Sequence, residues 1–134
     1  GLVGLAAAPD FTDDIWRALT PEQHEAMLRD GRIAIPSDFG GPYIYTLRLI
    51  EDGRRQRILD RPLHLPFPVR WLQGTADSAV PVATALRLLD HATGPDIRLT
   101  LIKDADHRLS TPDCLEMIRT TVQEIAGNGR QVAQ

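Results

Sequence analysis

The sequence predicts an α/β fold, in which helices flank a parallel sheet and a small helical cap is inserted between two strands. The run at 2–8 is apolar without polar alternation, which is typical of a strand buried on both faces of a parallel sheet. Further strand-like runs follow at 69–72 and 97–102. A helical pattern separates the last two runs and another follows the third, which is the order that crossover helices give.

The long segment between the first two strands, residues 10–66, is predicted to form the helical cap. About fifty residues separate the strands, far more than an ordinary loop contains. Capping and helix-ending residues divide this segment into three helices, with an irregular connection at 33–41. These residues are Thr12 before the first helix; Thr20 and Pro21 before the second, with Gly31 after it; and Pro42 and Tyr43 before the third, with Gly53 after it.

The rest of the chain completes a partial α/β domain over 1–126. Pro81 is predicted to open the helix between the second and third strands, because proline is favoured in a first helical turn. The last helix is expected to begin at Pro112 and to end at Gly127. Residues 127–134 are then a polar tail.

Composition excludes several classes of function. The chain of 134 residues has a formal charge of -3, and its 15 Lys and Arg are spread along it. We therefore expect no nucleic-acid partner and no anionic membrane surface. The apolar runs are far shorter than the ~20 residues of a membrane span. The single cysteine, Cys114, excludes an internal disulfide; because no export signal is visible, the expected location is cytoplasmic.

Neither a metal nor a cofactor is expected. The histidines outside the candidate site have no Cys or carboxylate at metal-ligand spacing; they are His24, His64 and His91. A group of arginines on the cap is interpreted as a solvated face, with contact to an acidic substrate group as the alternative. These are Arg48, Arg54, Arg55 and Arg57.

Two segments that follow strands carry the candidate catalytic residues. Asp77 lies in Gly74-Thr-Ala-Asp-Ser-Ala-Val-Pro81, and His107 lies in Ala105-Asp-His-Arg-Leu-Ser110. One helix and one strand separate them, which brings neighbouring strand ends together in a parallel sheet. In a serine hydrolase a carboxylate orients an imidazole, which takes the proton of the nucleophilic hydroxyl. We therefore predict Asp77 as the catalytic acid and His107 as the base.

Plainer interpretations exist for each residue taken singly. An Asp after a strand is commonly a turn residue, and a lone His is commonly structural. Asp10, at the end of the first strand, is the alternative acid, although a turn role is favoured for it. Asp104 and Asp106 flank His107, and nearby negative charge favours the imidazolium form. The favoured role of both is to shape a solvated loop.

The sequence offers no nucleophile. Its three serines are Ser37, Ser78 and Ser110, and none stands in Gly-x-Ser-x-Gly after a strand. Ser78 is favoured as a cap of the helix that follows it. Cys114 falls within the last helix, after the His, so we expect it to pack in the core.

The segments around Asp77 and His107 resemble the α/β-hydrolase family, in which an Asp after one strand and a His after the next meet beside a serine from earlier in the chain. Weaker similarity lies in Gly-Leu-Ala-Ala-Ala-Pro-Asp at 4–10, Ile-Pro-Ser at 35–37 and Leu-Ile-Glu-Asp-Gly at 49–53. Together they resemble the branch of mitochondrial palmitoyl-protein thioesterases and mycophenolic acid acyl-glucuronide esterases. The resemblance implies the C-terminal part of an α/β-hydrolase sheet, with Asp77 as triad acid and His107 as general base.

We therefore expect a C-terminal portion of a cofactor-free serine hydrolase that cleaves small-molecule or acyl-protein esters or thioesters. The resemblance implies that the serine and the oxyanion donors lie upstream of this chain. Because the chain begins inside a strand-like run without an initiator Met, we take Gly1 as a cut end and the isolated chain as inactive.

Two alternatives remain open. One is a non-catalytic half-domain that pairs with a partner chain, or with a second copy, through an open sheet edge. The other is an independent ligand-binding domain, which requires Asp77 and His107 to lie far apart.

Overall fold

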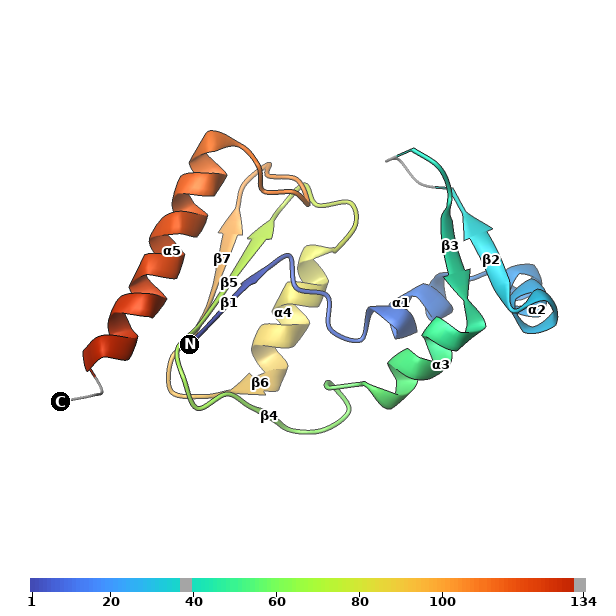
Figure 1. The fold of residues 1–134 in the computed structure, drawn as a ribbon, viewed down its shortest axis with the longest axis horizontal. Coiled ribbons are helices and arrows are strands. Elements are labelled where there is room, and N and C mark those ends of the chain that lie inside the picture. Colours follow the sequence, from blue (N-terminus) through green and yellow to red (C-terminus); the bar gives the residue numbers. More distant parts are fainter. Residues whose placement is uncertain (37–39, 132–134) are drawn as a thin grey trace. The chain divides into compact units, whose positions relative to one another are not determined.

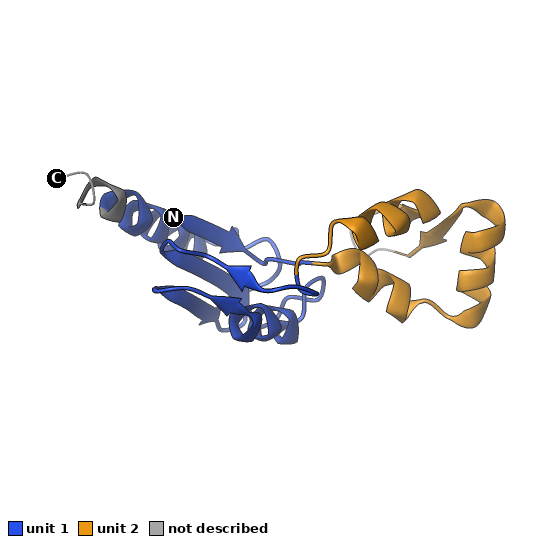
Figure 2. Cartoon of the chain, turned by 90° about the horizontal axis from the view of Figure 1, so that it is seen from below, with its two compact units in different colours: residues 1–9, 59–134 blue, residues 10–58 orange. Residues whose placement is uncertain are grey.

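A computed structural model describes residues 1–36 and 40–131 and divides the chain into two compact units (Figures 1 and 2). Unit 1 comprises Gly1–Pro9 and Leu59–Gln134, and unit 2 comprises Asp10–Ile58. Ser37, which belongs to one of the family-like phrases, lies outside the described residues. Among the helices that the described residues form, none has the length and apolar character needed to cross a membrane.

Unit 1 is built on a parallel sheet, which confirms the predicted α/β class. Its strands are β1 (Leu2–Leu5), β5 (Val69–Gly74) and β7 (Ile97–Ile102), in the order β1-β5-β7. The central strand β5 pairs with β1 from Leu2↔Val69 and with β7 from Val69↔Ile97. Both pairings are parallel, so β5 and β7 end side by side at Gly74↔Ile102.

One helix packs on each face of this sheet: α4 (Val82–His91) on one and α5 (Pro112–Gln131) on the other (Figure 1). Successive side chains of a strand point to opposite faces. Val69 and Trp71 accordingly pack with Leu88 of α4, whereas Leu72 packs with Cys114 of α5. The prediction that Cys114 packs in the core is confirmed, because the thiol side chain is buried there.

The first strand is less buried than its sequence predicted. Leu2 and Leu5 are exposed, because β1 forms one edge of the described sheet and has β5 as its only neighbour there. The expectation that both faces of this strand are covered is therefore wrong within the described residues.

The insertion expected over 10–66 forms a compact unit only as far as Ile58. Residues beyond it belong to unit 1, because Leu59, Leu63 and Leu65 pack in the core formed with Trp71. The short strand β4 (Leu63–His64) also pairs there, in parallel, with β6 (Ala92–Thr93).

Unit 2 contains α1 (Phe11–Ala18), α2 (Pro21–Asp30) and α3 (Leu47–Arg55), together with an antiparallel pair of strands, β2 (Arg32–Ile35) and β3 (Tyr43–Thr46). The buried core consists of Leu19, Met27, Ile33 and Ile50. The predicted start of α2 is confirmed: Thr20 forms a capping box with Gln23. Gly31 ends that helix at a φ of 71°, as predicted.

Unit 2 is not wholly helical, which corrects the prediction for 33–35 and 43–46. Residues expected to be an irregular connection and a first helical turn instead form β2 and β3. Isoleucine and tyrosine favour strands, and Ile33 pairs with Tyr45 while Ala34 pairs with Ile44. The third helix begins only at Leu47, where the Thr46 hydroxyl accepts a hydrogen bond from the Leu49 amide at 3.1 Å.

Three helix boundaries differ from the prediction. At two of them, the glycine or the hydroxyl expected to end or cap the helix packs between helices instead. Gly53 does not end α3. A Cβ there would clash with Thr12, so the glycine allows α1 and α3 to pack closely. Thr12 is correspondingly buried inside α1 and does not cap it. The last helix also continues past Gly127 as far as Gln131, so the polar tail expected from 127 is helical over its described part.

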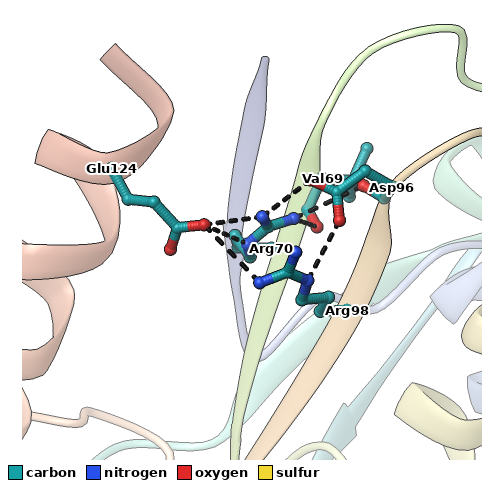
Figure 3. A network of polar contacts seen from close by, with 5 residues as sticks. All are labelled: Val69, Arg70, Asp96, Arg98 and Glu124. Atoms are coloured by element: carbon teal, nitrogen blue, oxygen red, sulfur yellow. Dashed lines mark hydrogen bonds and ion pairs between the residues drawn. The ribbon is translucent and has the colours of Figure 1, made fainter. Parts of the chain in front are cut away.

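A network of charges that the sequence analysis missed lies at the amino end of β5 (Figure 3). Arg70 is buried, and its Nη2 donates to Asp96 Oδ2 at 2.8 Å and to Glu124 Oε1 at 2.6 Å. Hydrogen bonds from Arg70 to both carboxylates raise the pKa of the guanidinium further. Arg98 adds a contact to Asp96 at 3.0 Å. The network joins the central strand to α5, which carries Glu124, and to the start of β7.

Candidate active site

Asp77 lies three residues beyond the end of β5, and its side chain is 0% exposed. Each of its two carboxylate oxygens has two hydrogen-bond donors. Oδ1 accepts from the backbone amides of Ala79 at 2.9 Å and Val80 at 2.8 Å. Oδ2 accepts from Gln73 Nε2 at 3.0 Å and faces His107 Nδ1 at 3.0 Å.

These donors keep the buried carboxylate ionised. Burial raises the pKa of Asp77, because it penalises the charged form. The hydrogen bonds from Val80, His107, Gln73 and Ala79 lower it, and together they outweigh burial. The net effect is a pKa below the usual aspartate value, so Asp77 is a carboxylate at neutral pH.

His107 is held by the loop that follows β7. Leu109 anchors this loop in the core of unit 1, where it is 1% exposed. The carboxylate of Asp106 accepts from the amides of Arg108 at 3.1 Å and Leu109 at 3.2 Å, as expected of a loop-shaping residue. Asp104 is exposed and contacts Lys103. The loop thus presents the imidazole with 40% of its side chain exposed.

The contact between Asp77 and His107 determines the tautomer of the neutral ring. An ionised carboxylate can only accept hydrogen bonds, so Nδ1 carries the proton and Nε2 has the free lone pair. Among the residues that the structure describes, Nε2 has no hydrogen-bond partner. An imidazole in this state can take a proton at Nε2, and Asp77 then stabilises the resulting charge. The alternative of an independent ligand-binding domain requires Asp77 and His107 to lie far apart, and the 3.0 Å contact between them contradicts it.

The loops that carry Asp77 and His107 are joined by close backbone contacts. Ala76 N donates to Ala105 O at 3.0 Å, and Asp104 N donates to the Thr75 hydroxyl at 2.8 Å. A Cβ on Gly74 would clash with the carbonyl of Ala105 and would lie 2.9 Å from that of Asp106. Only glycine therefore fits at the end of β5, because the His107 loop passes directly over it.

The other sequence candidates have structural contacts. Asp10 Oδ1 accepts from the Ile58 amide at 2.9 Å, which ties together the first and last residues of unit 2. Ser78 is exposed and does not cap α4, whose N-cap position is Pro81. Thr111 caps the last helix by accepting from the Cys114 amide at 3.3 Å.

The remaining histidines are engaged with unrelated groups. His24 Nε2 lies 2.8 Å from the Trp16 carbonyl, His91 Nε2 lies 2.8 Å from the Arg61 carbonyl, and His64 Nδ1 lies 3.3 Å from the Thr93 hydroxyl. Residues 1–36 and 40–131 contain no group of three or more His, Cys, Asp or Glu side chains placed to hold a metal ion.

The arginines predicted to lie on the cap make contacts within unit 2. Arg54 stacks on Trp16 at 4.8 Å from the ring centroid. Arg55 pairs with Asp52 at 3.1 Å, and Arg57 pairs with Asp13 at 3.5 Å.

Gln73 is a site residue that sequence reasoning missed. It lies in β5, four positions before Asp77, and donates to the carboxylate of that residue. A glutamine within a buried strand needs hydrogen-bond partners. The presence of Gln73 in such a strand, close before Asp77, was therefore the only indication in the sequence that it contacts the site.

Comparison with known proteins shows which proteins the chain is similar to. No family model matches the sequence. Over 126 residues the chain is 26% identical to the mitochondrial palmitoyl-protein thioesterase ABHD10 of Mus musculus, which covers 92% of the chain. A crystal structure of a putative hydrolase from Agrobacterium vitis S4 superposes with a TM-score of 0.88 at 36% identity, over 92% of this chain and 48% of that one. In sequence and in fold, the chain is similar to the C-terminal part of an α/β-hydrolase.

A second α/β-hydrolase structure agrees. The mouse alpha/beta hydrolase domain-containing protein 10 gives a TM-score of 0.84 at 25% identity, over 94% of this chain and 51% of that one. The chain spans only 42% of the length of the mouse thioesterase.

Substitution of Gly74 tests the close approach of the two loops. We expect Gly74→Ala to lower the free energy of unfolding by about 1–3 kcal/mol, because the added methyl group must push the His107 loop away. Urea denaturation of the chain measures this effect. Gly41→Ala is the control, because a Cβ at Gly41 meets nothing within 4 Å. Equal denaturation midpoints for the two variants would contradict the close approach.

The lowered pKa of Asp77 predicts how stability depends on pH. A group whose pKa is lower in the folded state stabilises the fold above its unfolded pKa, and this contribution is lost as pH falls through the folded value. We expect the stability difference between the wild type and Asp77→Asn to shrink as pH falls below about 4. Asp104→Asn, at an exposed position, serves as control. A difference that stays constant between neutral and acid pH would refute the prediction.

Proposed function

We propose that this chain supplies the acid and the general base of a serine hydrolase that cleaves carboxylic esters or thioesters. The contact of His107 Nδ1 with the buried Asp77 carboxylate at 3.0 Å is the observation that supports the proposal most directly. The free Nε2 of a half-exposed ring is the atom that a serine hydroxyl would approach. The similarity of sequence and fold to α/β-hydrolases supports the same chemistry.

The proposed reaction proceeds through an acyl-enzyme. The serine oxygen attacks the acyl carbon while His107 Nε2 takes its proton, and Asp77 stabilises the imidazolium. The ring then gives the proton to the departing alcohol or thiol. Water repeats the sequence and releases the acid. These steps need no cofactor, and the serine would come from a Gly-x-Ser-x-Gly segment, which this sequence lacks.

The relative named as a palmitoyl-protein thioesterase supports a thioester as the substrate class. Both an acyl-protein and a small-molecule ester remain within the proposal, because the chain covers less than half of that protein. The cytoplasmic location stays a prediction from the sequence, whereas the name of the relative states a mitochondrial one.

The proposal is tested in the complete hydrolase that includes this chain, with a chromogenic short-chain ester as substrate. We expect Asp77→Asn to lower kcat by about 10⁴-fold, because the wrong tautomer is then favoured, and His107→Gln to abolish turnover. Asp104→Asn should leave the activity unchanged, and a serine-directed phosphonate should block the wild type. The isolated 134-residue chain should not hydrolyse the ester. Full activity in both Asp77→Asn and His107→Gln would refute the proposal.

Exposed leucines on the edge strand favour a second candidate function. Leu2 and Leu5 of β1 are both exposed, and an open strand edge can pair with another chain. On this view the chain is a non-catalytic half-domain that associates through β1. Light scattering of the purified chain would then give at least a dimer mass. A folded monomer at micromolar concentration would count against it.

A further inference from the structure

Gln73 is the only residue whose side chain contacts the Asp77 carboxylate besides His107, within the described part of the chain. It is 1% exposed. Its Nε2 carries two hydrogens and lies within hydrogen-bond distance of three acceptors: Asp77 Oδ2 at 3.0 Å, Val80 O at 2.9 Å and Gly74 O at 3.2 Å. The amide therefore reaches from the end of β5 across the Asp77 loop to the residue before Pro81.

The surroundings of this amide leave it a single orientation. Three acceptor oxygens lie around Nε2, so a flipped side chain would place Oε1 against all three. In the observed orientation Oε1 is buried and has no hydrogen-bond partner among the described residues. A buried carbonyl left without a partner is costly. The position therefore favours the NH₂ group of the glutamine side chain, whereas its carbonyl oxygen gains no hydrogen bond there.

We propose that Gln73 is a positioning residue for the Asp77–His107 pair. The inference rests on the proposed function, because the pair must act as acid and base for its orientation to matter. Gln73 donates to Oδ2, the same oxygen that receives the Nδ1 proton of His107. The two backbone amides hold only Oδ1. Without Gln73, the partly exposed His107 is the remaining hydrogen-bond donor to Oδ2 among the described residues.

The electrostatics of the site agree with this role. The hydrogen bond from Gln73 is among those that lower the pKa of Asp77 against the effect of burial. Gln73 therefore helps both to aim the carboxylate and to keep it ionised, and an ionised carboxylate is what stabilises the imidazolium.

The test replaces Gln73 by methionine, which keeps most of the volume and removes the donor. We expect the pKa of Asp77 in Gln73→Met, followed through its ¹³C carboxyl resonance in the 134-residue chain, to be higher than in the wild type. In the complete hydrolase kcat should fall on the order of ten-fold with KM little changed, the effect of weakening one hydrogen bond to a charged group.

Thr75→Val is the matched control for the pKa measurement. It removes the hydrogen bond between the Thr75 hydroxyl and the Asp104 amide, which joins the same two loops, without touching the carboxylate. We expect the pKa of Asp77 to be unchanged in this variant. An equal rise in both variants would show that general loosening of the loops is responsible, and it would overturn the inference.

A measurement on the wild type keeps the inference testable if Gln73→Met does not fold. The side-chain amide protons of Gln73 should exchange slowly with solvent, and their resonances should shift at the same pH midpoint as the Asp77 carboxyl carbon. Fast exchange, or resonances that do not move at that midpoint, would overturn the assignment.

The outcome for Gln73 is separable from that for the proposed function. If Asp77→Asn and His107→Gln lose turnover while Gln73→Met leaves the pKa of Asp77 unchanged, only the inference about Gln73 fails. If both of those variants stay fully active while Gln73→Met raises the pKa of Asp77, the acid–base function fails and Gln73 remains only a structural partner of Asp77.

Discussion

A buried carboxylate is stable only where hydrogen-bond donors replace the water that it has lost, and this requirement determines the local structure around Asp77. The side chain is 0% exposed and has four donors. Two come from its own turn, one from Gln73 on the preceding strand and one from His107 on the next loop. The turn, the strand end and the second loop must therefore be in place together, and Gly74 is the residue that lets the second loop come close enough.

Charged side chains lie at both ends of the strands in unit 1, and the two groups differ in how completely their hydrogen bonds are satisfied. At the amino end of β5, Arg70 joins the strand to Asp96 and to Glu124 on α5, in a network that is closed by contacts among its own members. At the carboxyl end, the contact between Asp77 and His107 leaves His107 Nε2 without a hydrogen-bond partner among the described residues. Ligand sites of open α/β sheets form at the carboxyl ends of strands. The satisfied network thus serves stability, and the incompletely satisfied pair is the one that is suited to chemistry.

The sequence predicted what depends on spacing and periodicity, and it missed what depends on packing. The parallel strands and the pairing of Asp77 with His107 follow from the length of the strand-helix-strand unit. The role of Gly53 could not be predicted, because a helix-ending glycine and a helix-packing glycine look the same until the neighbour, here Thr12, is known. Strand β3 was read as helix because the periodicity of 42–53 outweighed the strand preference of its aromatic residues. Arg70 and Gln73 stood in an apolar strand, and their polarity alone did not indicate which partners they would find.

All the donors to Asp77 that the structure shows lie between Gln73 and His107, in one strand-helix-strand segment of unit 1. The geometry of the Asp77–His107 pair therefore does not depend on a nucleophile, and under the proposed function the pair can be ordered before a serine is brought to it. Pre-organisation of this kind is useful for catalysis, because the ring is already in the right tautomer and no free energy is spent in ordering it during the reaction. The four hydrogen bonds to Asp77 join it to its own turn, to β5 and to the His107 loop, so the Asp77–His107 contact forms in a chain that lacks a Gly-x-Ser-x-Gly segment.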